Sequence, residues 1–134
     1  MRVVLDSNVL VAAFATHGVC HDLFEHCLKN TTILCSDFIA GEVERILIDK
    51  IKIPARKASE IIHYLKSQAQ WISPQRVVVE NLRDPNGHMI IATALSGEAD
   101  YLITGDKGML VLKKIKGVVI ISPREYWIRY QTDL

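Results

Sequence analysis

The sequence predicts an α/β protein, a three-layer α/β/α sandwich built on a central parallel sheet of about five strands. The first observation is a set of five short runs rich in apolar and β-branched residues, at 2–5, 31–35, 76–80, 100–104 and 117–121. The second is that helix-like segments separate these runs. Strands that are apolar on both faces and alternate with helices indicate a parallel sheet covered by helices on both sides.

The helices are predicted from apolar periodicity together with start signals. They are expected, in chain order, over residues 7–29, 37–49, 55–69, 88–97 and 123–130. Ser36 is a capping-type residue in front of the second helix, and early prolines, Pro54 and Pro123, open the third and the last. The stretch Asp-Pro-Asn-Gly at 84–87 is predicted to be a turn before a helix, because all four residue types favour turns.

Length and composition predict one globular domain spanning residues 1–134. Hydrophobic residues make up 49% of the chain, enough for a proper core. The net charge of +1, from 16 basic and 15 acidic residues, excludes a global field that would draw nucleic acid to the surface. Three cysteines without a Cys-x-x-Cys pair favour reduced thiols, and no apolar run reaches the length of a membrane span. We therefore expect a soluble, cytoplasmic protein with no membrane segment.

Acidic residues follow three of the predicted strands. Asp6 comes directly after the first strand, Glu42 lies in the helix after the second, and Thr104-Gly105-Asp106 closes the fourth. In open α/β sheets the working site lies outside the carboxyl ends of the strands. The three acids are therefore expected to converge on one edge of the sheet if these strands are neighbours.

Carboxylates gathered without matching basic residues repel one another, and a fold tolerates this mainly when a cation binds between them. An all-oxygen ligand set points to magnesium or manganese, and such an ion supports phosphodiester hydrolysis. Each acid also has an ordinary structural explanation. Asp6 could cap the following helix, Glu42 could be a solvated helix residue, and Asp106 could be a turn former.

Three blocks of the sequence resemble the motif blocks of PIN-domain proteins, and most closely those of toxins from toxin-antitoxin pairs. They read VVLDSNVLVAA, CSDFIAGEVERIL and DPNGHMIIATALSGEADYLITGDKGML. The resemblance implies a metal-dependent, single-strand-specific ribonuclease, often dimeric and often inhibited by an antitoxin protein. It implies that Asp6, Glu42 and Asp106 bind the metal, with Asn8 and Thr104 as polar supports.

Two positions depart from the family pattern. A carboxylate is expected where this chain has Gly87, and a further one is often found where it has Gly108. Because magnesium keeps several waters and needs few protein carboxylates, this loss weakens a site without necessarily abolishing it. Asp84 lies about one helical turn before position 87, so its carboxylate, or the amide oxygen of Asn86, is a candidate substitute ligand.

The leading hypothesis is a PIN-like endoribonuclease with catalytic acids Asp6, Glu42, Asp84 and Asp106, using Mg²⁺ or Mn²⁺ and cleaving single-stranded RNA. We expect a homodimer or higher oligomer and an antitoxin partner. The alternative is a PIN-like module that binds RNA or protein without catalysis. A receiver-type phosphoryl-transfer domain is a third class, disfavoured because no second acid follows Asp6 and because Lys116 precedes the last strand.

Overall fold

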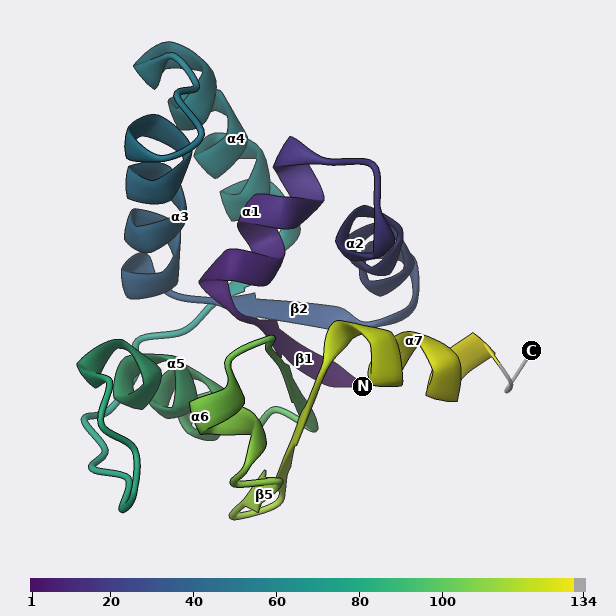
Figure 1. Ribbon diagram of the computed structural model, residues 1–134, viewed down its shortest axis with the longest axis vertical. Helices are drawn as coiled ribbons and strands as arrows, with labels where there is room; N and C mark the ends of the chain where they lie inside the picture. The colour runs from purple at the N-terminus through teal and green to yellow at the C-terminus, as the bar shows by residue number, and fades with distance from the viewer. Residues whose placement is uncertain (132–134) are drawn as a thin grey trace.

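The computed structural model describes residues 1–131 and contains a six-stranded sheet with helices on both faces (Figure 1). In chain order the elements are β1 (Arg2–Leu5), α1 (Ser7–Ala15), α2 (Val19–Asn30), β2 (Thr32–Cys35), α3 (Asp37–Asp49), α4 (Ala55–Gln68), β3 (Gln70–Trp71), α5 (Pro85–Ser96), β4 (Tyr101–Ile103), α6 (Lys107–Leu110), β5 (Lys114–Ile115), β6 (Val118–Ile121) and α7 (Pro123–Gln131). The predicted α/β class with a mostly parallel sheet is confirmed.

The strand order is β3-β2-β1-β4-β6-β5, and every neighbouring pair is parallel except β5 with β6. Val4 of β1 pairs with Leu34 of β2 on one side and with Leu102 of β4 on the other. The chain thus leaves β1 in one direction and returns on its other side. This reversal creates a switch point, where the loops after β1 and β4 diverge and leave room for a site.

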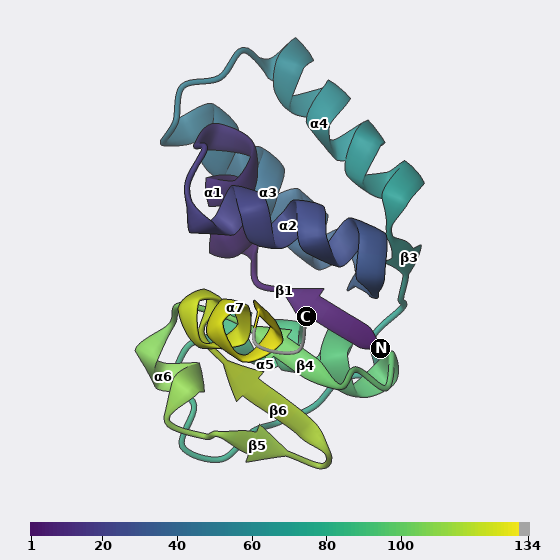
Figure 2. The ribbon, with the colours of Figure 1, turned by 90° about the vertical axis from the view of Figure 1, so that its right-hand side faces the viewer.

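Figure 1 shows α1 to α4 on one side of the sheet, and α5 and α6 on the other. Helix α7 returns to the first side and packs on α2, where the ring of His26 lies 5.6 Å from that of Trp127 (Figure 2). The core between these layers includes the fully buried Leu5, Leu34 and Leu102 of the three central strands. No helix within residues 1–131 is long and apolar enough to cross a membrane.

The helix predicted over 7–29 is wrong, because the structure has two helices there. Helix α1 ends at Ala15, and α2 begins at Val19 after Gly18. Thr16 adopts an extended conformation, and its hydroxyl donates to the carbonyl of Ala12 at 2.7 Å. Because of this break, two short helices pack over the sheet, whereas one straight helix of that length would extend beyond its edge.

The strand predicted over 76–80 is also wrong, although its sequence is strongly β-forming. The place beside β2 is taken by Gln70–Trp71, and Val78 is left 85% exposed in an irregular segment. Three further elements differ from the prediction. Helix α5 begins at Pro85 and not at 88, so residues 84–87 form its cap and first turn, and the short α6 and β5 were not predicted.

Candidate active site

Asp6 lies at the switch point, directly after β1. Its backbone N–H donates to the carbonyl of Ile103 in β4 at 2.9 Å, so the strand pairing itself sets the position of the side chain. The residue is 3% exposed, and its Oδ2 accepts a 2.6 Å hydrogen bond from the hydroxyl of Thr104. Burial raises the pKa of Asp6, the Thr104 hydrogen bond partly opposes this, and the negative charges of Glu42 and Asp106 raise it further.

Thr104 connects the acids that follow β1 and β4. The fully buried hydroxyl donates to Asp6 and accepts from the backbone N–H of Asp106 at 3.0 Å. Asp106 caps α6, because its Oδ1 accepts from the N–H of Gly108 at 2.7 Å. The Thr104 hydroxyl therefore fixes both the carboxylate of Asp6 and the backbone of Asp106.

Glu42 reaches the site from α3. The helix is capped by Ser36, whose hydroxyl accepts from Ile39 N–H and also bonds the hydroxyl of Thr93 in α5 at 3.0 Å. The Oε1 atom of Glu42 accepts a 2.7 Å hydrogen bond from Ser7. Sequence reasoning missed Ser7, and the signal available was only its position after Asp6.

The four predicted catalytic acids line one cavity of about 150 Å³. Its walls are formed by Asp6, Asn8, Glu42, Arg45, Ile46, Lys50, Asp84, Asn86, Gly87, Ile90, Asp106 and Met109. Asp84 is the exposed N-cap of α5, with Oδ1 accepting from the N–H of Asn86 at 3.0 Å. The two residues predicted to support the metal site lie in different places. Asn8 lines the cavity, whereas Thr104 lies behind it and contacts the site through its hydrogen bonds.

The donor set of the cavity fits a hard divalent cation, since its potential ligands are carboxylate and amide oxygens. Within residues 1–131, none of the four acids forms an ion pair with a lysine or arginine. In the same residues, no three Asp, Glu, His or Cys side chains lie close enough together to form a preformed metal-coordination site. The buried carboxylate of Asp6 thus carries a desolvation cost that no basic partner offsets, and a cation with its own waters would offset it.

Two comparisons with known proteins found a match, one to a family and one to a solved structure of the same fold. A model of the PIN domain family matches residues 2–108. A chain of the crystal structure of VapBC2 from Rickettsia felis, bound to a DNA fragment from its promoter, superposes with a TM-score of 0.65 at 17% identity. The match covers 91% of the present chain and 98% of that one. No curated protein matches the chain.

Proposed function

Because this chain belongs to the PIN domain family, we propose that it is a metal-dependent endoribonuclease that cleaves single-stranded RNA. The observation that carries the proposal is the buried Asp6 at the switch point, held by Thr104 and sharing one cavity with Glu42 and Asp106. Members of the family are generally nucleases, which supports hydrolysis of a phosphodiester bond.

Asp6, Glu42 and Asp106 would hold one Mg²⁺ or Mn²⁺, with Asp84 and Asn86 near enough on the cavity wall to join through water. When bound, such a cation supplies a water of lowered pKa and positive charge beside the scissile phosphate. The chain's own hydroxyls orient the acids: Thr104 occupies one oxygen of Asp6, and Ser7 occupies one oxygen of Glu42. These hydrogen bonds fix the orientation of both carboxylates.

Arg45 and Lys50 would bind the RNA backbone beside the acids. Arg45 is exposed on α3 and Lys50 is the exposed residue that caps its C-terminus. Both line the same cavity, and neither forms an ion pair with an acid in the described part of the chain. A guanidinium held next to an acidic centre can bind a phosphate oxygen through paired hydrogen bonds. These two side chains supply the local positive charge that the net charge of +1 does not.

The biological setting we propose is that of the toxin in a toxin-antitoxin pair, acting in the cytoplasm. The likeness to VapBC2 supports an antitoxin partner, and a homodimer is the oligomer that we propose. Because Gly87 stands where the family pattern has a carboxylate, the protein has one potential metal ligand fewer, and we expect it to be a weaker nuclease than a protein that has this carboxylate.

The test compares Glu42→Gln with Glu44→Gln, two neutralising changes two residues apart on one helix. Only Glu42 lines the cavity, and glutamine keeps an acceptor for the Ser7 hydroxyl. The proposal expects Mn²⁺ at about 100 times its Kd to stabilise the wild-type protein by about 2.7 kcal/mol, and expects RNA cleavage to require that metal. Glu42→Gln should lose both responses, and Glu44→Gln should keep both.

Two outcomes would reject the nuclease. One is RNA cleavage that persists in Glu42→Gln, which would assign the activity to another site or protein. The other is the absence of both Mn²⁺ stabilisation and cleavage in the wild-type chain. If single-stranded RNA still binds in that second case, the chain is a PIN-like binding module without catalysis, the alternative that the glycine at position 87 favours.

A further inference from the structure

Leu82 fills the space beside two glycines of the candidate site. A Cβ atom built on Gly87 would lie 2.9 Å from Cδ2 of Leu82, closer than real side chains approach. A Cβ atom on Gly108 would lie 3.9 Å from Cδ1 of the same leucine and 3.2 Å from Oδ1 of Asp106. The two ends of one buried isobutyl group thus face both positions.

The segment that carries Leu82 is attached to α5 by His88. The Nδ1 atom of His88 accepts from the backbone N–H of Val79 at 2.9 Å, and its Nε2 lies 2.7 Å from the carbonyl oxygen of Leu82. Because Nδ1 accepts, the proton is on Nε2, which donates to Leu82. A half-buried imidazole therefore fixes an otherwise irregular segment over the first turn of α5, with Leu82 pointing inward.

The remaining carboxylates offer few oxygens. One oxygen of Asp6, one of Glu42 and one of Asp106 already accept hydrogen bonds from Thr104, Ser7 and Gly108. Asp6 also accepts a hydrogen bond from the backbone N–H of Ser7, and Asp84 is the one further carboxylate of the cavity lining within residues 1–131. A bound divalent cation would complete its octahedral shell with waters, and a further carboxylate at position 87 would replace one of them.

We infer that Leu82 packs so closely against Gly87 that it keeps the side chain of a fourth ligand out of position 87, and so limits how tightly the site binds a divalent cation. This inference rests on the proposed metal-dependent function. Leu82 acts as a positioning residue: it touches no reacting atom, but it occupies the space that a fourth ligand at position 87 would need. Leu82 and Gly87 are consequently expected to behave as one unit under mutation.

The experiment is a double-mutant cycle with Leu82→Ala, Gly87→Asp and the double variant. Unfolding free energies are measured in urea without metal, and Mn²⁺ binding is measured by isothermal titration calorimetry. The wild-type chain should bind one Mn²⁺. Gly87→Asp alone should be destabilised and gain no affinity, because the aspartate meets Leu82. The double variant should recover stability relative to that single change and bind Mn²⁺ about 10- to 100-fold more tightly than wild type.

Gly41→Asp is the matched control, because a Cβ there meets nothing within 4 Å and Gly41 lies outside the cavity lining. It should change neither Mn²⁺ stoichiometry nor affinity. Gly87→Ala adds only the Cβ atom that would clash with Leu82, so its unfolding free energy can be measured even if Gly87→Asp fails to fold. Combining it with Leu82→Ala should relieve the destabilisation caused by Gly87→Ala.

Several results would overturn the inference. A Gly87→Asp variant that is stable and binds Mn²⁺ more tightly than the wild-type chain would reject the exclusion of a ligand by Leu82. Additive effects of the changes at 82 and 87 would also reject it, whatever the nuclease activity. Absence of Mn²⁺ binding by the wild-type chain would instead refute the proposed function, and with it the premise of a cation site.

Discussion

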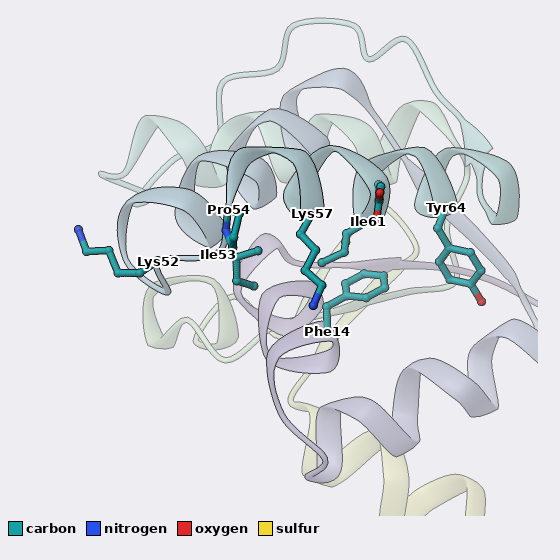
Figure 3. A pocket seen from close by; sticks show the side chains of 8 residues that line it. Phe14, Lys52, Ile53, Pro54, Lys57, Ile61 and Tyr64 are labelled. Carbon is teal, nitrogen blue, oxygen red and sulfur yellow. The ribbon is translucent and has the colours of Figure 1, made fainter.

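The acidic cavity and the apolar groove between α1 and α4 differ in both size and chemistry. The groove has a volume of about 580 Å³. Figure 3 shows Phe14 of α1 facing Ile61 and Tyr64 of α4, with Lys57 between Ile53 and Phe14 and Lys52 at the edge. The cavity is only about 150 Å³, yet four carboxylates line it.

This difference shows that size does not identify the chemical site. The groove lies between α1 and α4, and its formation does not require the fold to bury a charged side chain. In the cavity the fold buries Asp6, and burial raises the pKa of its carboxyl group. Such burial is destabilising, and a purely structural site would lack it. We therefore expect mutations of the cavity to change RNA cleavage and metal binding, and mutations of the groove to change stability alone.

Asp6→Asn is expected to have the largest effect. Removing a carboxylate that stabilises bound positive charge should lower RNA cleavage about 100-fold or more, as expected for a loss of several kcal/mol. The same change should raise the stability of the metal-free protein, because an amide is cheaper to bury than a carboxylate. Cleavage assays and urea denaturation measure the two effects, and the exposed Asp49→Asn is the control. A stable variant with full activity would remove Asp6 from the site.

The pH dependence of metal-free stability follows from the same residue. The folded-state pKa of Asp6 is raised above the ordinary value of 3.8, so between these two values the folded chain holds a proton that the unfolded chain has lost. This contribution to stability is present below pH 3.8 and is lost as the pH rises through the folded-state pKa. Subtracting the Asp6→Asn curve from the wild-type curve should reveal a fall of that sign.

Phe14→Ala tests the groove. The ring of Phe14 lies 5.1 Å from that of Phe24 and is half-buried, so its loss should cost about 2–3 kcal/mol of unfolding free energy. Mn²⁺ binding should stay unchanged. Tyr64→Phe, which retains the facing ring, should be close to neutral in both measurements. Loss of Mn²⁺ binding by folded Phe14→Ala would show that the two regions are coupled.

Thr104→Val is expected to change both stability and metal binding. The substitution preserves the shape of the side chain and removes one hydroxyl behind the cavity. Asp6 would lose its 2.6 Å donor and the N–H of Asp106 its acceptor, at a cost of about 1–3 kcal/mol. We also expect weaker Mn²⁺ binding, since Asp6 is no longer oriented. Thr32→Val, at the exposed start of β2, is the control. Unchanged Mn²⁺ affinity would mean that Thr104 serves folding alone.

Arg45→Gln should have the smallest effect, a few-fold loss of RNA affinity. Losing one phosphate contact should reduce the slope of log K against log salt by about 0.7 for single-stranded RNA. Arg56→Gln is the matched control, since Arg56 pairs with Glu60 at 3.7 Å on α4 and does not line the cavity. Equal slopes for Arg45→Gln and the wild-type chain would place the RNA elsewhere.

Local sequence signals predicted much of the fold and many of the cavity residues. Helix 37–49 matches the structure in both bounds, because its cap at Ser36 and its periodicity are local properties. The placement of Asp6 and Asp106 after parallel strands follows from chain order and from the rule for switch points. The strand predicted at 76–80 failed because pairing beside β2 was decided by another segment.

The sequence by itself determined the α/β class, the succession of most elements and the residue types available for chemistry, since apolar periodicity and capping act over a few residues. Tertiary structure alone decided that Ser7 supports Glu42, that Thr104 joins Asp6 to the backbone of Asp106, and that Leu82 covers Gly87 and Gly108. These contacts depend on how strands align and how a loop folds back on a helix. Both are set by packing between segments distant in the chain, which local patterns do not encode.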